Sequence, residues 1–203
     1  MGDHAKDRVS GDGKIFLASM DIAASLGWER CSLSDIATKA EIDIADLTEL
    51  HGDKIGILRA LAKFIDSKTL TGLDSEDGSD ISVRENLLES LMLRFDTMAP
   101  YKSGIANVAR ATLANPRNVI EGSWVLARSM RETLSMAGLS TSGPLGMIRV
   151  KAMMIIFLDV FRVWIDDQSP DLSATLRRLD ERLNQAESLA LTFGIAQPSR
   201  SVY

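Results

Sequence analysis

The sequence predicts an all-helical protein with a small N-terminal domain, built around a helix-turn-helix unit, and a larger C-terminal helical domain. Only 5% of its 203 residues are aromatic, whereas nine are methionine. This composition suits packed helices better than a β-sandwich or a barrel. Apolar residues recur three and four positions apart along most of the chain, and glycine or proline stands near the expected ends of several of these periodic segments.

The first helix is expected over residues 13–26, after a polar and mobile arm over residues 1–12. One face of this helix is apolar and carries Phe16, Leu17, Met20, Ala23 and Ala24. Gly27 suits the left-handed conformation that ends many helices. Together with the helix-turn-helix unit and a linking helix, this segment forms the predicted N-terminal domain, residues 13–70.

The stretch over residues 27–63 predicts three short helices with a tight turn in the middle. Ser32 and Asp35 fit a capping box, in which the serine hydroxyl accepts an amide at the helix start. Asp43 is the expected N-cap of the second helix, residues 44–50. A helix, a short turn and a second helix make a helix-turn-helix unit.

Scaffold positions of this domain carry a resemblance to a known family. They are the helix from Ile15 to Leu26, Gly27-Trp28, Ser32-Leu33-Ser34-Asp35-Ile36-Ala37, Ala40, Ile42, Leu47, Lys54 and Leu58. At these positions the chain resembles the DNA-binding domain of the tetracycline-repressor (TetR) family. The resemblance implies a homodimeric transcriptional regulator, with a C-terminal ligand-binding and dimerisation domain and operator DNA as its partner.

The residues that the resemblance places toward DNA are Ser32, Ile44, Asp46, Thr48 and Lys54. Most DNA-facing positions depart from the family pattern. Glu41 stands at the turn glycine, Asp43 at a small polar residue, and Thr48 at a tyrosine that contacts phosphate. The resemblance is therefore strong at the scaffold positions and weak at the positions that would contact DNA.

The segment from Trp28 to Lys54 is acidic for a surface that should face a polyanion. It holds seven acidic and three basic residues, a net charge of −4. Because DNA affinity rests largely on neutralising phosphates, a recognition helix with Asp46 and Glu49 and no base should be repelled. Either the unit reads a specific operator with unusual residues, or it is kept only as a folding module. The net charge of the whole chain, −5, also argues against a generic nucleic-acid binder.

An acidic linker, residues 71–80, precedes the predicted C-terminal domain, residues 81–194. Five helices are expected there, over residues 81–98, 101–113, 116–137, 147–165 and 170–190. The fourth is apolar nearly all round and is expected to be buried. A tail, residues 195–203, follows the last helix.

Parts of the C-terminal domain resemble a second group of proteins. The matching pieces are Leu93 to Asp96, Pro100 to Gly104, Ala137-Gly138 and, above all, Arg162 to Thr175. They look like the accessory lipid-binding proteins of ubiquinone biosynthesis, which have a TetR fold, bind isoprenoid lipid and assist a hydroxylase. The implied alternative is an accessory protein that does not bind DNA. Mitochondrial members end in a membrane-docking helix, whereas Gly194 to Tyr203 is too polar for one, so stable membrane insertion is not expected.

Seven apolar residues are candidates for a pocket that takes a hydrophobic small molecule or isoprenoid lipid: Leu91, Phe95, Met98, Trp124, Met130, Met153 and Phe157. Flexible methionines suit an adaptable cavity. Residue by residue, an ordinary core role is the stronger interpretation, and the resemblance alone favours a cavity.

Six residues near the C-terminus are candidates for a homodimer interface: Phe161, Trp164, Leu172, Leu176, Leu179 and Leu183. The leucines alternate in steps of four and three, which is typical of a helix with a partner helix. TetR-like dimers pair their last two helices in a four-helix bundle.

No residue pattern supports catalysis, a cofactor or a metal site. The chain has two histidines, His4 and His51, and neither a glycine-rich phosphate loop nor a nucleophile elbow. Asp166, Asp167 and Asp171 resemble a metal cluster at a glance. A charged loop that caps the last helix is the favoured interpretation.

Two further expectations concern single side chains. Cys31 is the one cysteine, so no intramolecular disulfide can form, which is consistent with a cytoplasmic location. Cys31 is expected to be a small buried residue. Asp159 and Arg162, three positions apart on one helix, are expected to form an ion pair.

Overall fold

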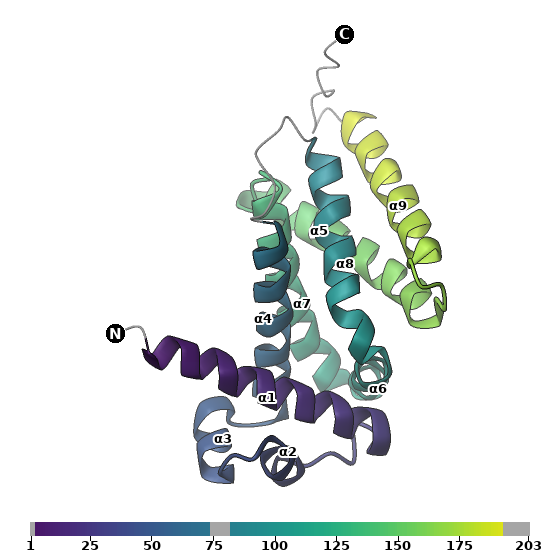
Figure 1. Cartoon of the computed structure of the whole chain (residues 1–203). Helices are drawn as coiled ribbons and strands as arrows, with labels where there is room; N and C mark the ends of the chain where they lie inside the picture. The colour runs from purple at the N-terminus through teal and green to yellow at the C-terminus, as the bar shows by residue number, and fades with distance from the viewer. Residues whose placement is uncertain (1–2, 74–81, 193–203) are drawn as a thin grey trace. The chain divides into compact units, whose positions relative to one another are not determined.

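The computed structural model describes residues 3–73 and 82–192, with side chains described over residues 13–69 and 82–192. Every regular element in these residues is helical, which confirms the predicted all-α fold class (Figure 1). The elements are α1 (Asp3–Leu26), α2 (Leu33–Ala40), α3 (Ile44–His51), α4 (Lys54–Leu73), α5 (Val83–Met98), the 3-10 turn η1 (Ala99–Tyr101), α6 (Lys102–Leu113), α7 (Pro116–Met136), α8 (Gly143–Asp166) and α9 (Ser173–Thr192).

Two helices start earlier than the sequence predicts. α1 begins at Asp3, so the predicted arm is helical from that residue onward. Gly11 and Gly13 lower helix propensity, but neither is sufficient to end a helix. α8 begins at Gly143, because Pro144 is compatible with the first turn of a helix.

The chain divides into two compact units, and each is described by itself. Unit 1 comprises residues 1–70 and 97–129, and unit 2 comprises residues 71–96 and 130–203. The units and the predicted domains share a division near residue 70. They differ in residues 97–129, which cluster with the N-terminal helices. Most of the predicted linker and the whole predicted tail lie outside the described residues.

Stacked rings and one close helix contact hold unit 1 together. The Phe16 ring stacks on the Phe64 ring with centroids 4.7 Å apart, and it meets the Tyr101 ring edge-on at 4.6 Å. α1 and α6 approach closely at Gly104, where an added Cβ would lie 2.5 Å from the carbonyl oxygen of Met20. Glycine is therefore required at this crossing, since any side chain would push the two backbones apart.

An aromatic cluster from α5 and α8 forms the centre of unit 2. The Phe95 ring centroid lies 5.3 Å from that of Phe157 and 5.7 Å from that of Trp164. The ring of Phe161 lies 5.4 Å from the ring of Trp164. Phe95 and Trp164 have no exposed surface, so this cluster buries the largest side chains of the unit.

Ion pairs connect α8 to α9 inside unit 2. The carboxylate of Asp159 accepts a hydrogen bond from Nε of Arg182 at 2.8 Å and another from Nε of Arg178 at 2.7 Å. These two guanidinium groups hold the pKa of Asp159 well below its usual range. The predicted pair with Arg162 is therefore wrong: the partners of Asp159 come from the neighbouring helix and not from its own.

The loop between α8 and α9 is organised by a buried carboxylate. Asp167 accepts hydrogen bonds from the backbone amide of Thr175 at 2.9 Å, from its hydroxyl at 2.7 Å, and from the amide of Ser169 at 3.0 Å. Burial alone would raise the pKa of Asp167, but the hydrogen bonds from Ser169 and Thr175 outweigh it and hold the pKa well below the usual range. The capping interpretation of this acidic loop agrees with these contacts.

Replacing Asp167 with alanine is expected to destabilise the protein by about 1–3 kcal/mol at pH 7, because the buried Thr175 hydroxyl and amide lose their acceptor. A carboxylate whose pKa falls on folding stabilises the fold above its unfolded pKa of 3.8. This stabilisation is lost as the pH falls below that value. Urea unfolding at pH 7 and pH 3 should therefore show a smaller difference between variant and parent at the lower pH. Asp171→Ala, in the same loop but exposed, serves as the control and should change stability much less.

Candidate functional site

The helix-turn-helix unit has the local structure that its sequence predicts. The hydroxyl of Ser32 accepts the amide of Asp35 at 3.1 Å, and the amide of Ser32 donates to the Asp35 carboxylate at 2.9 Å, which completes the capping box of α2. The carboxylate of Asp43 accepts the amide of Ala45 at 2.7 Å and caps α3. Both helices therefore start where their caps place them.

The turn between α2 and α3 keeps a glycine-like backbone without glycine. Glu41 has φ 56° and ψ 44°, which is the left-handed helical region. A residue with a Cβ pays about 1–2 kcal/mol for this conformation. The turn geometry is thus retained although the glycine that the resemblance implies is absent.

Replacing Glu41 with glycine is expected to stabilise the protein by about 0.5–1 kcal/mol. The relief of left-handed strain exceeds the extra chain entropy that glycine loses on folding. The measurement is the urea unfolding free energy. Glu41→Ala is the matched control: it removes the same charge but keeps a Cβ, so a similar gain from alanine would assign the effect to charge and contradict the strain argument.

The outward face of α3 is acidic and partly apolar. Ile44 and Leu50 are exposed, as are Asp46, Thr48 and Glu49. The hydroxyl of Thr48 donates to the carbonyl of Ile44 at 2.7 Å. No hydrogen bond or ion pair joins the carboxylate of Asp46 or of Glu49 to any other residue whose side chain is described. Three of the predicted DNA-facing residues, Ile44, Asp46 and Thr48, are thus exposed on α3.

The other two predicted DNA-facing residues have structural partners. Ser32 is committed to its capping box. The amine of Lys54 donates to the carbonyl oxygen of Trp28 and lies 4.8 Å from the centroid of its ring. Burial lowers the pKa of Lys54. Another base of the unit, Lys39, is 3.3 Å from the carboxylate of Asp21. The unit therefore has exposed free acids, while two of its bases are engaged.

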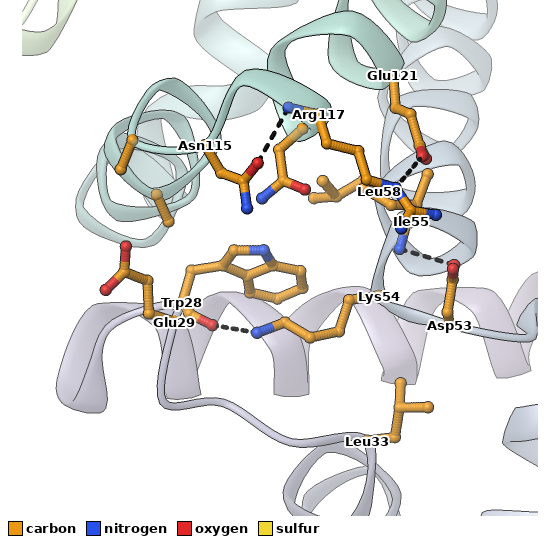
Figure 2. Close-up of a pocket in the computed structure, with 13 residues that line it drawn as sticks. Trp28, Glu29, Leu33, Asp53, Lys54, Ile55, Leu58, Asn115, Arg117 and Glu121 are labelled. Atoms are coloured by element: carbon orange, nitrogen blue, oxygen red, sulfur yellow. Dashed lines mark hydrogen bonds and ion pairs between the residues drawn. The ribbon is translucent and has the colours of Figure 1, made fainter.

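A cleft of about 760 Å³ lies within unit 1, beside the helix-turn-helix unit. Its walls come from the turn between α1 and α2, the starts of α2 and α4, the end of α6 and the start of α7 (Figure 2). Trp28 and Lys54 lie on one side of it, and Asn115 and Arg117 on the other. This cleft could not be predicted from the sequence, because its two sides are far apart along the chain.

Five of the seven predicted pocket residues are buried in unit 2: Leu91, Phe95, Met130, Met153 and Phe157. Met98 is buried but belongs to unit 1. Trp124 also belongs to unit 1, and 74% of its surface is exposed. The structure therefore places five of the predicted pocket residues in the core of unit 2, whereas Met98 and Trp124 belong to unit 1.

The predicted interface residues are mostly buried within one chain. Trp164, Leu172, Leu179 and Leu183 are buried, Phe161 is half-buried, and Leu176 is exposed. Leu179 and Leu183 of α9, and Leu172 just before it, are thus buried within their own chain, whereas Leu176 is not. The large exposed apolar residues of α8 are different ones: Leu145, Met147, Ile148, Ile155 and Leu158.

No three histidine, cysteine, aspartate or glutamate side chains among the described residues are placed to hold a metal ion. None of the helices in the described part of the chain has the length and apolar character needed to cross a membrane.

The architecture is a TetR-like fold with a helix-turn-helix unit near its N-terminus. A TetR transcriptional regulator from Nitrosomonas europaea aligns with a TM-score of 0.70 and 19% sequence identity, over 87% of this chain and 98% of that one. A TetR transcriptional regulator from Rhodococcus sp. RHA1 aligns with a TM-score of 0.60 and 16% identity, over 87% and 97%. These likenesses confirm the TetR-like fold.

No protein-family model matches the chain, and a search of curated proteins finds no match either. The second resemblance, to the accessory proteins of ubiquinone biosynthesis, is not shown by any of the comparisons. At identities this low, the structural likeness establishes the fold, and the function has to be argued from the residues.

Proposed function

We propose that this protein is a ligand-responsive transcriptional regulator of the TetR type, acting as a homodimer. The observation that carries the proposal is the helix-turn-helix unit itself. Both of its helices keep their caps, and Glu41 holds the turn in a strained left-handed conformation. Strain that persists at one turn is typical of functional segments.

The ligand would be a hydrophobic small molecule held by the unit 2 cluster around Phe95 and Phe157.

The acidic residues exposed on α3 determine which bases the protein is proposed to recognise. Asp46 and Glu49 can accept hydrogen bonds from the amino groups of cytosines in the major groove. Such contacts specify a sequence only after other residues have anchored the phosphates. Arg30 and Lys14 are exposed bases of unit 1 and are the proposed anchors.

Fluorescence anisotropy of the full-length protein on its own upstream DNA, compared with a scrambled duplex, tests the proposal. Measurements at low and moderate salt separate specific from purely electrostatic binding. Preference for the native sequence at both salt concentrations is the expected result. No binding even at low salt would remove the regulator from consideration.

The proposed dimer uses the exposed apolar residues of α8. Ile155, which is 69% exposed, and Leu158 lie one turn apart on this helix, and Leu176 of α9 is also exposed. Exposed apolar residues grouped on one helix are typical of an interface. This proposal extends the predicted pairing of the last two helices to residues that are free to meet a second copy.

Replacing both Ile155 and Leu158 with glutamate is expected to convert the dimer to a monomer, because four buried carboxylates would face each other across the two-fold axis. Size-exclusion chromatography with light scattering measures the mass directly. Leu17→Glu, at an exposed leucine of α1, is the control and should leave the mass unchanged. A monomeric parent protein would contradict the proposed dimer.

A second candidate function is a lipid-binding accessory protein that does not bind DNA. The observation that favours it is the pair of free carboxylates on α3, which repel phosphates. Native mass spectrometry of the purified protein distinguishes the candidates: a co-purified isoprenoid lipid, together with no DNA binding at low salt, would support the accessory role.

A further inference from the structure

We propose that the cleft of unit 1 binds a small arylalkylammonium ligand, in which a primary amine is attached to an aromatic skeleton. The volume of about 760 Å³ lies in the range of sites for small organic molecules. All residues that line the cleft belong to unit 1 and none to the aromatic cluster of unit 2, so the cleft is a second site in addition to the proposed ligand pocket.

Most charged groups on the walls of the cleft already have partners. The Lys54 amine is held by the carbonyl oxygen and the ring of Trp28. The carboxylate of Asp53 accepts two amides at the start of α4, at 3.0 and 2.9 Å. Arg117 pairs with Glu121 at 3.2 Å. Both cations that line the cleft therefore already have partners, although those of Lys54 are uncharged groups.

Glu29 is different from these residues. No hydrogen bond or ion pair connects its carboxylate to any other residue whose side chain is described. Lys54 is near enough for the two charges to interact, but the ammonium of Lys54 is committed to Trp28. The lining residues carry three carboxylates (Glu29, Asp53 and Glu121) against two cations (Lys54 and Arg117), a net charge of −1, so the complement of the cleft is a cation.

The remaining wall suits an aromatic skeleton. Leu33, Ile55 and Leu58 line the cleft together with the ring of Trp28. In Figure 2 the Trp28 ring lies between Glu29 and the apolar pair Ile55 and Leu58. A ligand whose amine meets Glu29 can therefore extend over Trp28 and place its ring against the leucines. The class of ligand that fits this arrangement has an amine at one end and an aromatic ring at the other, joined by an alkyl chain.

Because of its location, a ligand in the cleft would regulate the helix-turn-helix unit; this part of the inference rests on the proposed function. A bound molecule would contact the start of α4, directly after α3, and the turn between α6 and α7 at the same time. It would fix the helix-turn-helix unit against α6 and α7 within unit 1. Binding at this site would therefore change the freedom of α3 to adapt to DNA.

Isothermal titration calorimetry of the full-length protein at pH 7 tests the binding, with 2-phenylethylamine as the probe. Two probes with the same ring are the comparison: neutral 2-phenylethanol and anionic phenylacetate. The amine is expected to bind at least about tenfold more tightly than either, which corresponds to one charge-assisted hydrogen bond. Glu29→Gln should remove this preference, and Glu49→Gln, on the exposed face of α3, should keep it.

A second variant tests the place of binding. Ala114→Trp fills the cleft from the exposed end of α6 and should abolish binding of the amine. Equal binding of the three probes, no measurable binding of the amine, or unchanged binding in Glu29→Gln would each overturn the proposal. None of these measurements involves DNA, so a protein that binds the amine but no operator would contradict the proposed function and leave this site standing.

Discussion

Replacing Asp46 and Glu49 together with lysine is expected to raise the affinity for duplex DNA at least about tenfold at low salt. The two carboxylates are exposed on α3 and have no partner among the described side chains, so the exchange reverses an uncompensated charge. Each new lysine that meets a phosphate should also steepen the plot of log affinity against log salt by about 0.9. Fluorescence anisotropy with a labelled duplex, over a salt series, measures both quantities.

A double variant of equal net charge controls for the total charge of the protein. Glu89→Lys with Asp166→Lys changes two exposed acids of α5 and α8, neither of which belongs to the helix-turn-helix unit. This variant should bind DNA much less strongly than the α3 variant. If both doubles gain the same affinity, α3 has no special position relative to DNA.

Replacing Trp164 with alanine is expected to destabilise the protein by about 3–5 kcal/mol. The side chain is fully buried, and its ring lies 5.7 Å from Phe95 and 5.4 Å from Phe161. Truncation leaves a large cavity in a cluster that the remaining rings cannot fill. Thermal and urea unfolding measure the loss, which should appear as a lower midpoint with little change in the urea dependence of the unfolding free energy.

Trp124→Ala is the matched control, since it removes the same side chain from a position that is 74% exposed. Surface substitutions of this kind usually change stability by no more than about 0.5 kcal/mol. A large loss from Trp124→Ala would show that this residue is covered in solution. The pair of variants therefore separates a core tryptophan from one that faces solvent.

Local features of the fold could be predicted from the sequence because their causes are local. The capping box joins residues three positions apart, Ser32 and Asp35, and Asp43 caps the helix that begins next to it. Helical periodicity likewise identifies a helix without information about its neighbours. The all-α class and the helix-turn-helix unit follow from such signals.

Side-chain partners were harder to predict because they depend on which helices pack together. Asp159 has partners 19 and 23 positions away, and these are preferred over the nearby Arg162. Lys54 reaches a carbonyl 26 positions before it, so a residue expected to face DNA has a scaffold contact. Sequence spacing shows which residues share a face, but not which face a second helix will cover.

The leucine repeat of α9 illustrates the same limit for interfaces. Leu172, Leu179 and Leu183 are spaced for a partner helix, and the structure shows them buried within one chain. A repeat of this kind does not reveal whether the partner belongs to the same molecule. The candidate cleft was not predictable either, because it exists only where the end of α6 and the start of α7 meet the turn between α1 and α2.

Unit 1 is discontinuous in sequence, and this affects how it can form during synthesis. Residues 1–70 leave the ribosome first, but the edge partner of Phe16 is Tyr101, and α1 packs against Gly104. The side-chain amide nitrogen of Asn107 also donates to the backbone carbonyl of Ala23 at 2.8 Å. One side of α1 therefore stays uncovered, and the nascent helix-turn-helix segment cannot complete its core, until α6 has been translated. For the same reason a fragment that ends at residue 70 lacks part of its own core, and it is a poor substitute for the intact chain in any DNA-binding experiment.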